Sequence, residues 1–249
     1  MPTIEIETPD GPAEAYLARP DEGAHPGVLL YMDAIGLRPQ IEAMAGRIAS
    51  WGYVVLAPNV FHRDGRAAQL APRTDLTVPE NREAFFRGAM RRVGALTPDR
   101  AEPDARLWVD ALLERAAAPI GVIGYCMGAR LAVRTAGLRP DVVRAVGGFH
   151  GGGLVTGDAD SPHHRIAEAR AEFVFGHADR DRSMPPEAVE ELGRTLDAAG
   201  LTHTNEVYAG AAHGYSRADT ASYDEAATER HFAELEALFA RTLGDDSVG

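Results

Sequence analysis

The segment Gly124-Tyr125-Cys126-Met127-Gly128, directly after the apolar run Ile120–Ile123, most constrains how this chain folds. A cysteine flanked at this spacing by two glycines predicts a sharp turn from a strand into a helix, because the turn closes only around small residues. The helix would place its first N–H groups beside Cys126, where their dipoles favour a thiolate and an oxyanion. A lone cysteine is often just a small apolar core residue. The flanking pattern instead predicts that Cys126 is a nucleophile.

Apolar runs and helical spacings alternate along the rest of the chain. The patterns predict strands at Ile4–Thr8, Ala13–Ala18, Pro26–Met32, Tyr53–Ala57, 119–124, Val142–Phe149, Ala171–Gly176 and Thr202–Tyr208. They predict helices at Gln40–Ser50, 81–93, 100–117, Cys126–Gly137, Pro186–Ala199 and Ala221–Leu243. This alternation indicates an α/β fold with a mostly parallel central sheet of about eight strands and helices on both faces. Residues 61–98 are expected to form a surface excursion and a helix near the site.

Composition narrows the class of protein. With 249 residues, 45% of them hydrophobic, and no linker-like segment or repeat, the whole chain 1–249 is expected to form one domain. The formal net charge of −12 argues against nucleic acid or an anionic membrane as a partner. One cysteine excludes a disulfide within the chain. The chain begins without a signal-peptide pattern and has no apolar run near the roughly 20 residues that span a bilayer, so we expect a cytoplasmic protein.

All 25 basic residues are arginine, and the chain has no lysine. This excludes catalysis through a Schiff-base lysine, a P-loop lysine or a Ser-Lys dyad. Arginine remains important locally, because its planar fork can bind a carboxylate through two parallel hydrogen bonds.

A base and an acid for Cys126 are expected on loops after later strands, since working residues in such sheets follow the carboxyl ends of strands. His213, in Gly210-Ala211-Ala212-His213-Gly214, follows the last predicted strand and is the candidate base. The acid would fix the tautomer and orientation of its ring. Two aspartates, Asp179 and Asp181, lie in the loop 176–185 after the preceding strand, and position alone leaves both open.

At these residues the sequence resembles the dienelactone hydrolase family, which places a Cys-His-Asp triad on an α/β-hydrolase fold. The resemblance runs from about residue 10 to 242. Besides the segment around Cys126, the matching segments are Tyr31–Gly36, Ala57–Phe61, Asp181–Pro185 and the His213 loop. The resemblance implies that Cys126 is the nucleophile and His213 the base. It favours Asp181 over Asp179 as the acid, because Asp181–Pro185 reproduces the family's turn.

The resemblance also implies roles around the substrate. The backbone N–H groups of Met127 and Ala34 would form the oxyanion hole. Arg82 and Arg217 match positions that hold a substrate carboxylate, which suggests a small anionic substrate. Asp33 stands where a glutamate commonly engages the thiol. Being one methylene shorter, Asp33 would either contact Cys126 or only hold its loop. Phe86 replaces an aromatic residue that often carries a hydroxyl.

Two further patterns are not expected to carry chemistry. His150-Gly151-Gly152-Gly153 copies a lipase oxyanion motif, but it follows the nucleophile in sequence, whereas that motif precedes it. His163 and His164, with Asp158 and Asp160 nearby, lack metal-ligand spacing, and no metal is expected.

The sequence therefore predicts a cysteine hydrolase that cleaves a small ester or lactone through an acyl-enzyme, without a cofactor. A broad-specificity carboxylesterase or thioesterase with the same three residues is one alternative. A redox-sensing or ligand-binding domain without turnover is another. The expected partner is the small-molecule substrate, not nucleic acid or membrane, and the expected assembly is a monomer or weak homodimer.

Overall fold

Eight strands form a single sheet in the computed structural model, which describes residues 3–244. The spatial order is β1-β2-β4-β3-β5-β6-β7-β8. From β4 to β8 all neighbours are parallel, whereas β2 runs antiparallel to both β1 and β4. The strands are β1 Thr3–Ile6, β2 Ala13–Ala18, β3 Pro26–Tyr31, β4 Val54–Pro58, β5 Ala117–Tyr125, β6 Val143–Phe149, β7 Glu172–Ala178 and β8 His203–Tyr208.

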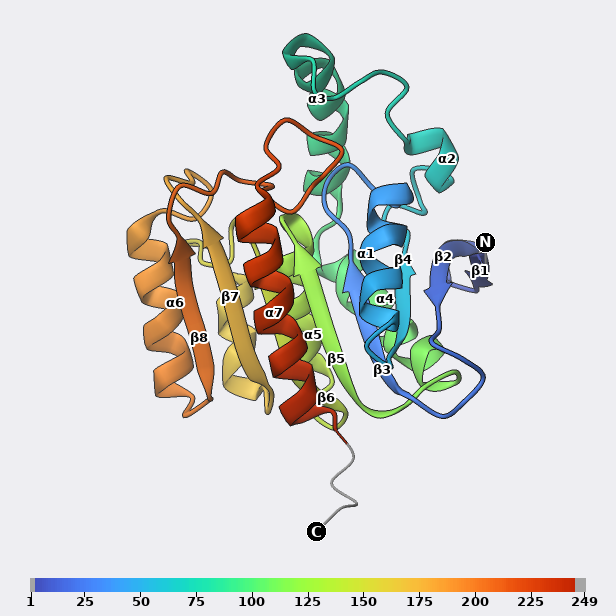
Figure 1. Ribbon diagram of the computed structural model, residues 1–249, viewed down its shortest axis with the longest axis vertical. Helices are drawn as coiled ribbons and strands as arrows, with labels where there is room; N and C mark the ends of the chain where they lie inside the picture. Colours follow the sequence, from blue (N-terminus) through green and yellow to red (C-terminus); the bar gives the residue numbers. More distant parts are fainter. Residues whose placement is uncertain (1–2, 245–249) are drawn as a thin grey trace.

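Helices cover both faces of this sheet (Figure 1). They are α1 Pro39–Ala49, α2 Ala67–Leu70, α3 Pro79–Ala95, α4 Pro98–Leu113, α5 Met127–Leu138, the 3-10 helix η1 Pro162–Glu168, α6 Pro186–Ala198 and α7 Glu225–Thr242. α1 and α7 pack on one face, and α4 and α5 pack on the other. The predicted α/β-hydrolase architecture is confirmed. Within residues 3–244, no helix has the length and apolar character needed to cross a membrane.

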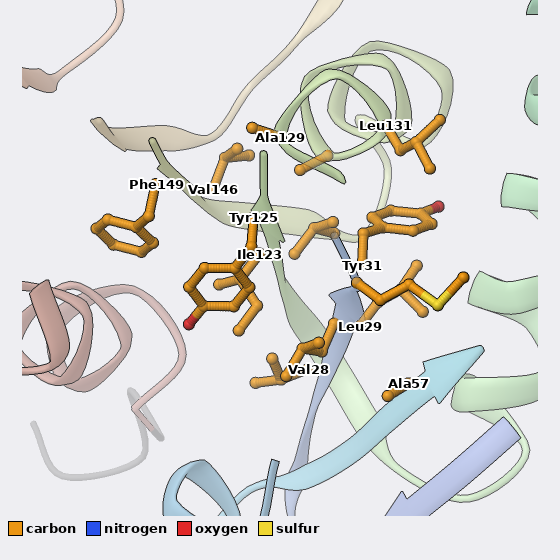
Figure 2. Packing of buried hydrophobic residues seen from close by; sticks show 14 of the residues in the cluster. Val28, Leu29, Tyr31, Ala57, Ile123, Tyr125, Ala129, Leu131, Val146 and Phe149 are labelled. Carbon is orange, nitrogen blue, oxygen red and sulfur yellow. The ribbon is translucent and has the colours of Figure 1, made fainter. Parts of the chain in front are cut away.

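The neighbouring strands β3, β4 and β5 carry no charged side chain, as expected of strands buried on both faces. Tyr31 at the end of β3 and Tyr125 at the end of β5 show the two sides (Figure 2). The Tyr31 hydroxyl lies 2.8 Å from Thr135 Oγ1 on α5, and the Tyr125 hydroxyl lies 3.2 Å from His231 Nε2 on α7. Each buried hydroxyl thus has a hydrogen-bond partner, so the aromatic rings pack in the core without leaving a polar group unpaired.

The helix predicted at 100–117 extends too far. α4 ends at Leu113, and Ala117 already belongs to β5, where its N–H donates to the His25 carbonyl at 2.8 Å. The alanines at 116–118 favour a helix locally, but pairing with β3 decides their conformation. The short helices α2 and η1 were not predicted, and α2 lies in the segment 61–98 expected to form a surface excursion.

The parallel strands bring their following loops to one edge of the sheet. β5, β7 and β8 end at the upper edge in Figure 1, where the long α3 also stands above the sheet. This arrangement places the loops that carry Cys126, Asp181 and His213 side by side, as expected for the carboxyl ends of parallel strands.

Candidate active site

Cys126 lies at the turn between β5 and α5 in a backbone conformation that side-chain-bearing residues rarely adopt, with φ 56° and ψ −118°. Its N–H donates to the Phe149 carbonyl at 3.1 Å, which helps to hold the turn. A Cβ at Gly124 would lie 2.1 Å from the Gly128 carbonyl oxygen, and one at Gly128 would lie 2.6 Å from the Met32 carbonyl oxygen. Both glycines are therefore needed for this turn to close.

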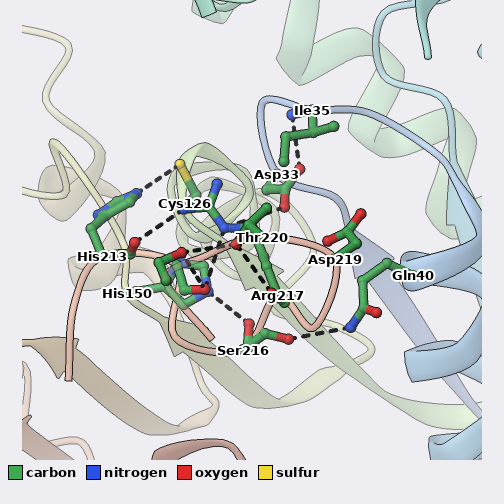
Figure 3. Close-up of polar contacts among 12 residues, drawn as sticks. Asp33, Ile35, Gln40, Cys126, His150, His213, Ser216, Arg217, Asp219 and Thr220 are labelled. Atoms are coloured by element: carbon green, nitrogen blue, oxygen red, sulfur yellow. Dashed lines mark hydrogen bonds and ion pairs between the residues drawn. The ribbon is translucent and has the colours of Figure 1, made fainter. Parts of the chain in front are cut away.

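A chain of hydrogen bonds joins the three residues predicted for catalysis (Figure 3 shows the Cys126–His213 contact). Cys126 Sγ lies 3.1 Å from His213 Nε2, and His213 Nδ1 lies 2.6 Å from Asp181 Oδ2. These are the distances that a nucleophile, a general base and an orienting acid require. Residues 126, 181 and 213 are far apart in sequence and meet only because their strands end at the same edge of the sheet.

The structure separates the two aspartates that sequence position left open. Asp181 contacts His213, and its other oxygen accepts hydrogen bonds from the Ser183 N–H at 2.8 Å and the Ser183 hydroxyl at 2.7 Å. Asp179 instead accepts from the Gly210 N–H at 2.9 Å, and thus joins the β7 loop to the loop before His213. The geometry therefore supports Asp181 as the acid and gives Asp179 a structural contact.

The charges of Cys126 and His213 support each other. Burial raises the pKa of the Cys126 thiol, but the hydrogen bond from His213 and its charge outweigh burial and leave that pKa below its usual value. Burial lowers the pKa of His213, whereas its hydrogen bonds to Asp181 and Cys126 raise it, with a net value of about 9. His213 is therefore protonated at neutral pH, and its positive charge favours the thiolate form of Cys126, so the two groups titrate together.

Two residues expected to supply backbone N–H groups line the cavity that contains Cys126. Met127 is the first residue of α5, and the first N–H groups of a helix have no partner within it. Ala34 follows β3, and both residues line the cavity that contains Cys126. This placement matches the geometry of an oxyanion hole made of the residue after the nucleophile and a residue of the loop after β3.

Asp33 is fully buried and holds its loop. Its oxygens accept hydrogen bonds from Arg38 Nη1 at 2.9 Å, Arg38 Nη2 at 3.1 Å and the Ile35 N–H at 2.8 Å. Burial alone would raise the pKa of Asp33, but the charges of Arg38 and Arg217 lower this pKa by a larger amount, so the carboxylate stays charged. Asp219 binds the other edge of Arg38, with Oδ2 2.6 Å from Nε. Of the two alternatives for Asp33, the described contacts favour the one in which it orders the loop that carries Ala34.

Arg82 and Arg217 both line the cavity, but they differ in their contacts. Arg217 is buried, and it donates to the His213 carbonyl at 3.1 Å and the Gly214 carbonyl at 3.4 Å (Figure 3). Its Nε also lies 4.0 Å from Asp33 Oδ2. Arg82 on α3 makes no side-chain hydrogen bond or ion pair with any of residues 3–244. Arg217 therefore braces the His213 loop, while the guanidinium of Arg82 is available to a ligand.

The cavity around Cys126 has a volume of about 630 Å³, which suits a small ligand. Apolar side chains of α3 form one wall: Phe86, Met90 and Val93. Its lining contains three arginines and no aspartate or glutamate among the described residues. The cavity thus combines apolar walls with positively charged arginines, and this combination suits an organic anion.

A model of the dienelactone hydrolase family matches residues 13–243, nearly the whole chain. The chain belongs to the dienelactone hydrolase family. It is 26% identical over 274 aligned positions to a Salmonella typhi protein named "Putative carboxymethylenebutenolidase", covering 98% of this chain and 93% of that one. It is also 26% identical to a carboxymethylenebutenolidase of Rhodococcus opacus, over 84% of this chain and 77% of that protein.

Solved structures agree on the fold. A dienelactone hydrolase-like promiscuous phosphotriesterase from metagenomic libraries superposes with a TM-score of 0.75 at 18% identity, over 97% of this chain and 98% of that one. The family match and the carboxymethylenebutenolidase relatives establish that the protein is a hydrolase of the dienelactone hydrolase type.

Several residues that contact the candidate active site were not predicted from the sequence. Ser183 fixes Asp181, and the spacing Asp-x-Ser was a local signal for that contact. His150 stacks edge-on against His213, with ring centroids 5.3 Å apart, and its Nε2 lies 2.8 Å from Ser216 Oγ. Arg38 reaches Asp219 across 181 positions of sequence, and no local pattern announces that contact.

The two patterns not expected to carry chemistry have other uses. Gly152 and Gly153 of the His150 segment line the cavity, as a loop at a strand end. His163 Nδ1 lies 2.7 Å from Ser161 Oγ, and His164 Nδ1 lies 3.2 Å from the Ala159 carbonyl. Across residues 3–244, no cluster of three or more His, Cys, Asp or Glu side chains is arranged to hold a metal.

Proposed function

We propose that this protein hydrolyses a small ester or lactone that carries a carboxylate, through a thioester formed on Cys126. The observation that carries the proposal is the hydrogen-bonded chain from Cys126 through His213 to Asp181, at the wall of a cavity that, among residues 3–244, is lined by three arginines and by no aspartate or glutamate. A thiolate, an oriented imidazolium and unpaired backbone donors beside it are the requirements of acyl transfer.

In the first half-reaction, Cys126 Sγ attacks the carbonyl carbon, and the carbonyl oxygen becomes an oxyanion held by the N–H groups of Met127 and Ala34. The oxyanion then collapses, the bond from carbon to the leaving oxygen breaks, and His213 Nε2 donates its proton to that oxygen. The products are a thioester on Cys126 and an alcohol, or, from a lactone, a hydroxyl that stays attached to the acyl chain.

In the second half-reaction, His213 accepts a proton from water, and the resulting hydroxide attacks the thioester carbon. The carbon–sulfur bond breaks, the free acid leaves, and the thiolate–imidazolium pair is restored. Asp181 keeps Nδ1 of His213 protonated in both steps, which presents Nε2 to the sulfur and to water. This cycle consumes one water and needs no cofactor.

We assign the substrate carboxylate to Arg82 in the lining of the cavity. Arg82 on α3 has no hydrogen-bond or ion-pair partner among residues 3–244, and a guanidinium binds a carboxylate through two hydrogen bonds. We also infer a reducing compartment such as the cytoplasm, because the proposed nucleophile is a thiol with a lowered pKa that oxidation would inactivate.

The test is hydrolysis of a dienelactone and of a neutral aryl ester by the wild type and by Cys126→Ala. We expect both activities to vanish in the variant, and mass spectrometry of the quenched wild type to find the acyl group on Cys126. Hydrolysis that survives in Cys126→Ala would refute the thioester route. A wild type that turns over neither compound but oxidises reversibly at Cys126 would instead support a redox sensor.

A further inference from the structure

The arginines of this protein differ in whether their charge is matched. Of those with a partly or fully buried side chain within residues 3–244, only Arg82, Arg92 and Arg130 have no hydrogen bond and no ion pair. Arg92 lies over the rings of Phe61 and Phe85, at 5.5 and 5.8 Å. Arg82 and Arg130 have neither an acceptor nor a ring, and both line the cavity around Cys126.

Arg130 lies on the side of the cavity formed by the turn between β5 and α5 that carries Cys126, which we call the elbow. It is in the first turn of α5, four residues after Cys126, so both face the same side of the helix. Its Nη1 would lie 4.0 Å from a Cβ placed on Gly153. Burial lowers the pKa of Arg130, and the nearby negative charge of Cys126 raises it without cancelling that effect. Arg130 is thus a partly desolvated cation that forms no ion pair with any aspartate or glutamate of residues 3–244.

Arg82 and Arg130 mark opposite ends of the cavity. Arg82 and Val93 lie eleven residues apart on α3, about 16 Å along the helix axis at 1.5 Å per residue. Val93 and Arg130 together line a second cavity of about 290 Å³, which shares Met127 and Gly153 with the first and is not lined by Arg82. Arg130 therefore belongs to the Val93 end, whereas Cys126 and Arg82 line the first cavity alone.

The charges around the second cavity favour an anion at Arg130 but not beyond it. Arg134 donates to Glu102 and to the Asp160 carbonyl, so its charge is matched. Asp158 and Asp160 line the second cavity and would repel an anion placed deeper. Arg130, at the junction of the two cavities, is the available cation on this side.

We propose that Arg130 is a second anion-binding residue of the cavity, and that the preferred substrate carries a carboxylate on each side of its scissile ester bond. One carboxylate contacts Arg82 and the other contacts Arg130. This inference rests on the proposed ester hydrolysis and narrows its substrate class to esters or lactones of dicarboxylate type.

The test uses four esters that differ only in where a carboxylate stands. The acyl group is hexanoyl or adipoyl with a free carboxylate, and the leaving group is 4-nitrophenol or 3-carboxy-4-nitrophenol. We expect the wild type to have its highest kcat/KM on the ester with both carboxylates. Arg130→Gln is expected to lose about 10- to 100-fold on esters with a carboxylate at one of the two positions, and Arg82→Gln at the other.

Three controls separate this role from others. The ester without a carboxylate is expected to keep its kcat/KM within about twofold in both variants, by the same free-energy scale. Arg130→Lys should restore part of the loss, because it keeps the charge. Arg91→Gln removes an exposed charge from α3 outside the lining of the cavity and should leave all four values unchanged.

Equal loss on all four esters would overturn the proposal, because it would assign Arg130 to the thiolate or the fold. Loss in both variants for the same carboxylate position would also overturn it, because the cavity would then have one anion site. The same loss in Arg91→Gln would show a long-range field instead of contact.

A wild type that hydrolyses none of the four esters would refute the proposed function without deciding this inference. Calorimetry with the amide N-(3-carboxyphenyl)adipamic acid then decides it, because an amide carries both carboxylates and resists turnover. Binding that is weakened in Arg130→Gln and in Arg82→Gln would support two anion sites. Equal binding of the neutral N-phenylhexanamide by the wild type would overturn them.

Discussion

The two walls of the cavity are built in opposite ways. On the elbow wall, Cys126 sits in a left-handed backbone conformation between glycines that admit no Cβ, and its neighbours are buried. On the facing wall, α3 buries only Ala89 and Val93, and Met90 is 55% exposed. The reacting atoms thus lie on the part of the molecule with the least freedom. The wall formed by α3, which we propose selects the substrate, has few buried residues, so packing constrains its side chains only weakly.

The elbow stores strain that its surroundings offset. A non-glycine residue at positive φ costs about 1–3 kcal/mol. The Cys126 N–H bond to Phe149 and the close packing of α5 against β3 and β5 keep the residue there. α3 has no such requirement, so substitutions on the two walls should have unequal consequences.

The largest difference is expected for Gly124→Ala against Gly88→Ala. The new Cβ at residue 124 would meet the Gly128 carbonyl oxygen at 2.1 Å, which forces the elbow apart. We expect a loss of more than about 4 kcal/mol in the free energy of unfolding, or no folded protein. Gly88 in α3 has no atom within 4 Å of its would-be Cβ, so alanine should stabilise the helix by about 0.5–1 kcal/mol.

Urea denaturation of both variants measures these changes, and circular dichroism before denaturation shows whether the fold is retained. A Gly124→Ala protein with native stability would mean that the elbow can relax, and the contrast between the walls would fail. Destabilisation by Gly88→Ala would show that α3 is packed more tightly than its exposed surface indicates.

The next contrast lies in the loop after β7, between Asp181→Asn and Asp179→Asn. Asparagine at 181 removes the charge that orients His213, and we expect kcat on an aryl ester to fall by about 10²- to 10⁴-fold. Asparagine at 179 keeps a side-chain oxygen that can accept from the Gly210 N–H, so kcat should stay within about threefold, less than 1 kcal/mol.

The Asp181→Asn variant should also change how the reactivity of Cys126 depends on pH. The hydrogen bond to Asp181 raises the pKa of His213, and the resulting imidazolium lowers the pKa of Cys126. Alkylation of Cys126 by iodoacetamide should therefore decline only when the pH falls below the usual range of a thiol. Asp181→Asn lowers the pKa of His213 and should move that decline to higher pH. An unchanged profile would separate the acid from the thiolate.

The elbow and the order of its partners were predictable because each leaves a local mark. The glycine spacing around Cys126 follows from backbone sterics. His213 comes directly after a strand, Thr202–Tyr208, that could be recognised from its sequence. The choice of Asp181 over Asp179 came from the family resemblance, and the hydrogen bond to His213 supports it. The fold was predictable for the same reason, since strands buried on both faces are continuous apolar runs.

The remaining contacts depend on distant side chains and left no such mark. Asp33 is ordered by Arg38, whose other edge binds Asp219. Within residues 3–244, Arg130 shares with Arg82 a place in the cavity lining without a hydrogen-bond or ion-pair partner, which only the arrangement of the chain in space reveals. The end of α4 was misplaced because pairing with β3 outweighed local helix propensity.

The smallest effect is expected at Met90, and it tests the α3 wall directly. Because Met90 is 55% exposed, Met90→Gln should change the free energy of unfolding by no more than about 0.5 kcal/mol. The side chain lines the cavity, so KM for a hexanoyl ester should rise a few-fold while kcat stays the same, since the chemistry lies on the other wall. A fall in kcat as large as the rise in KM would mean that α3 positions the reacting bond. In that case the division of chemistry and selection between the two walls would be wrong.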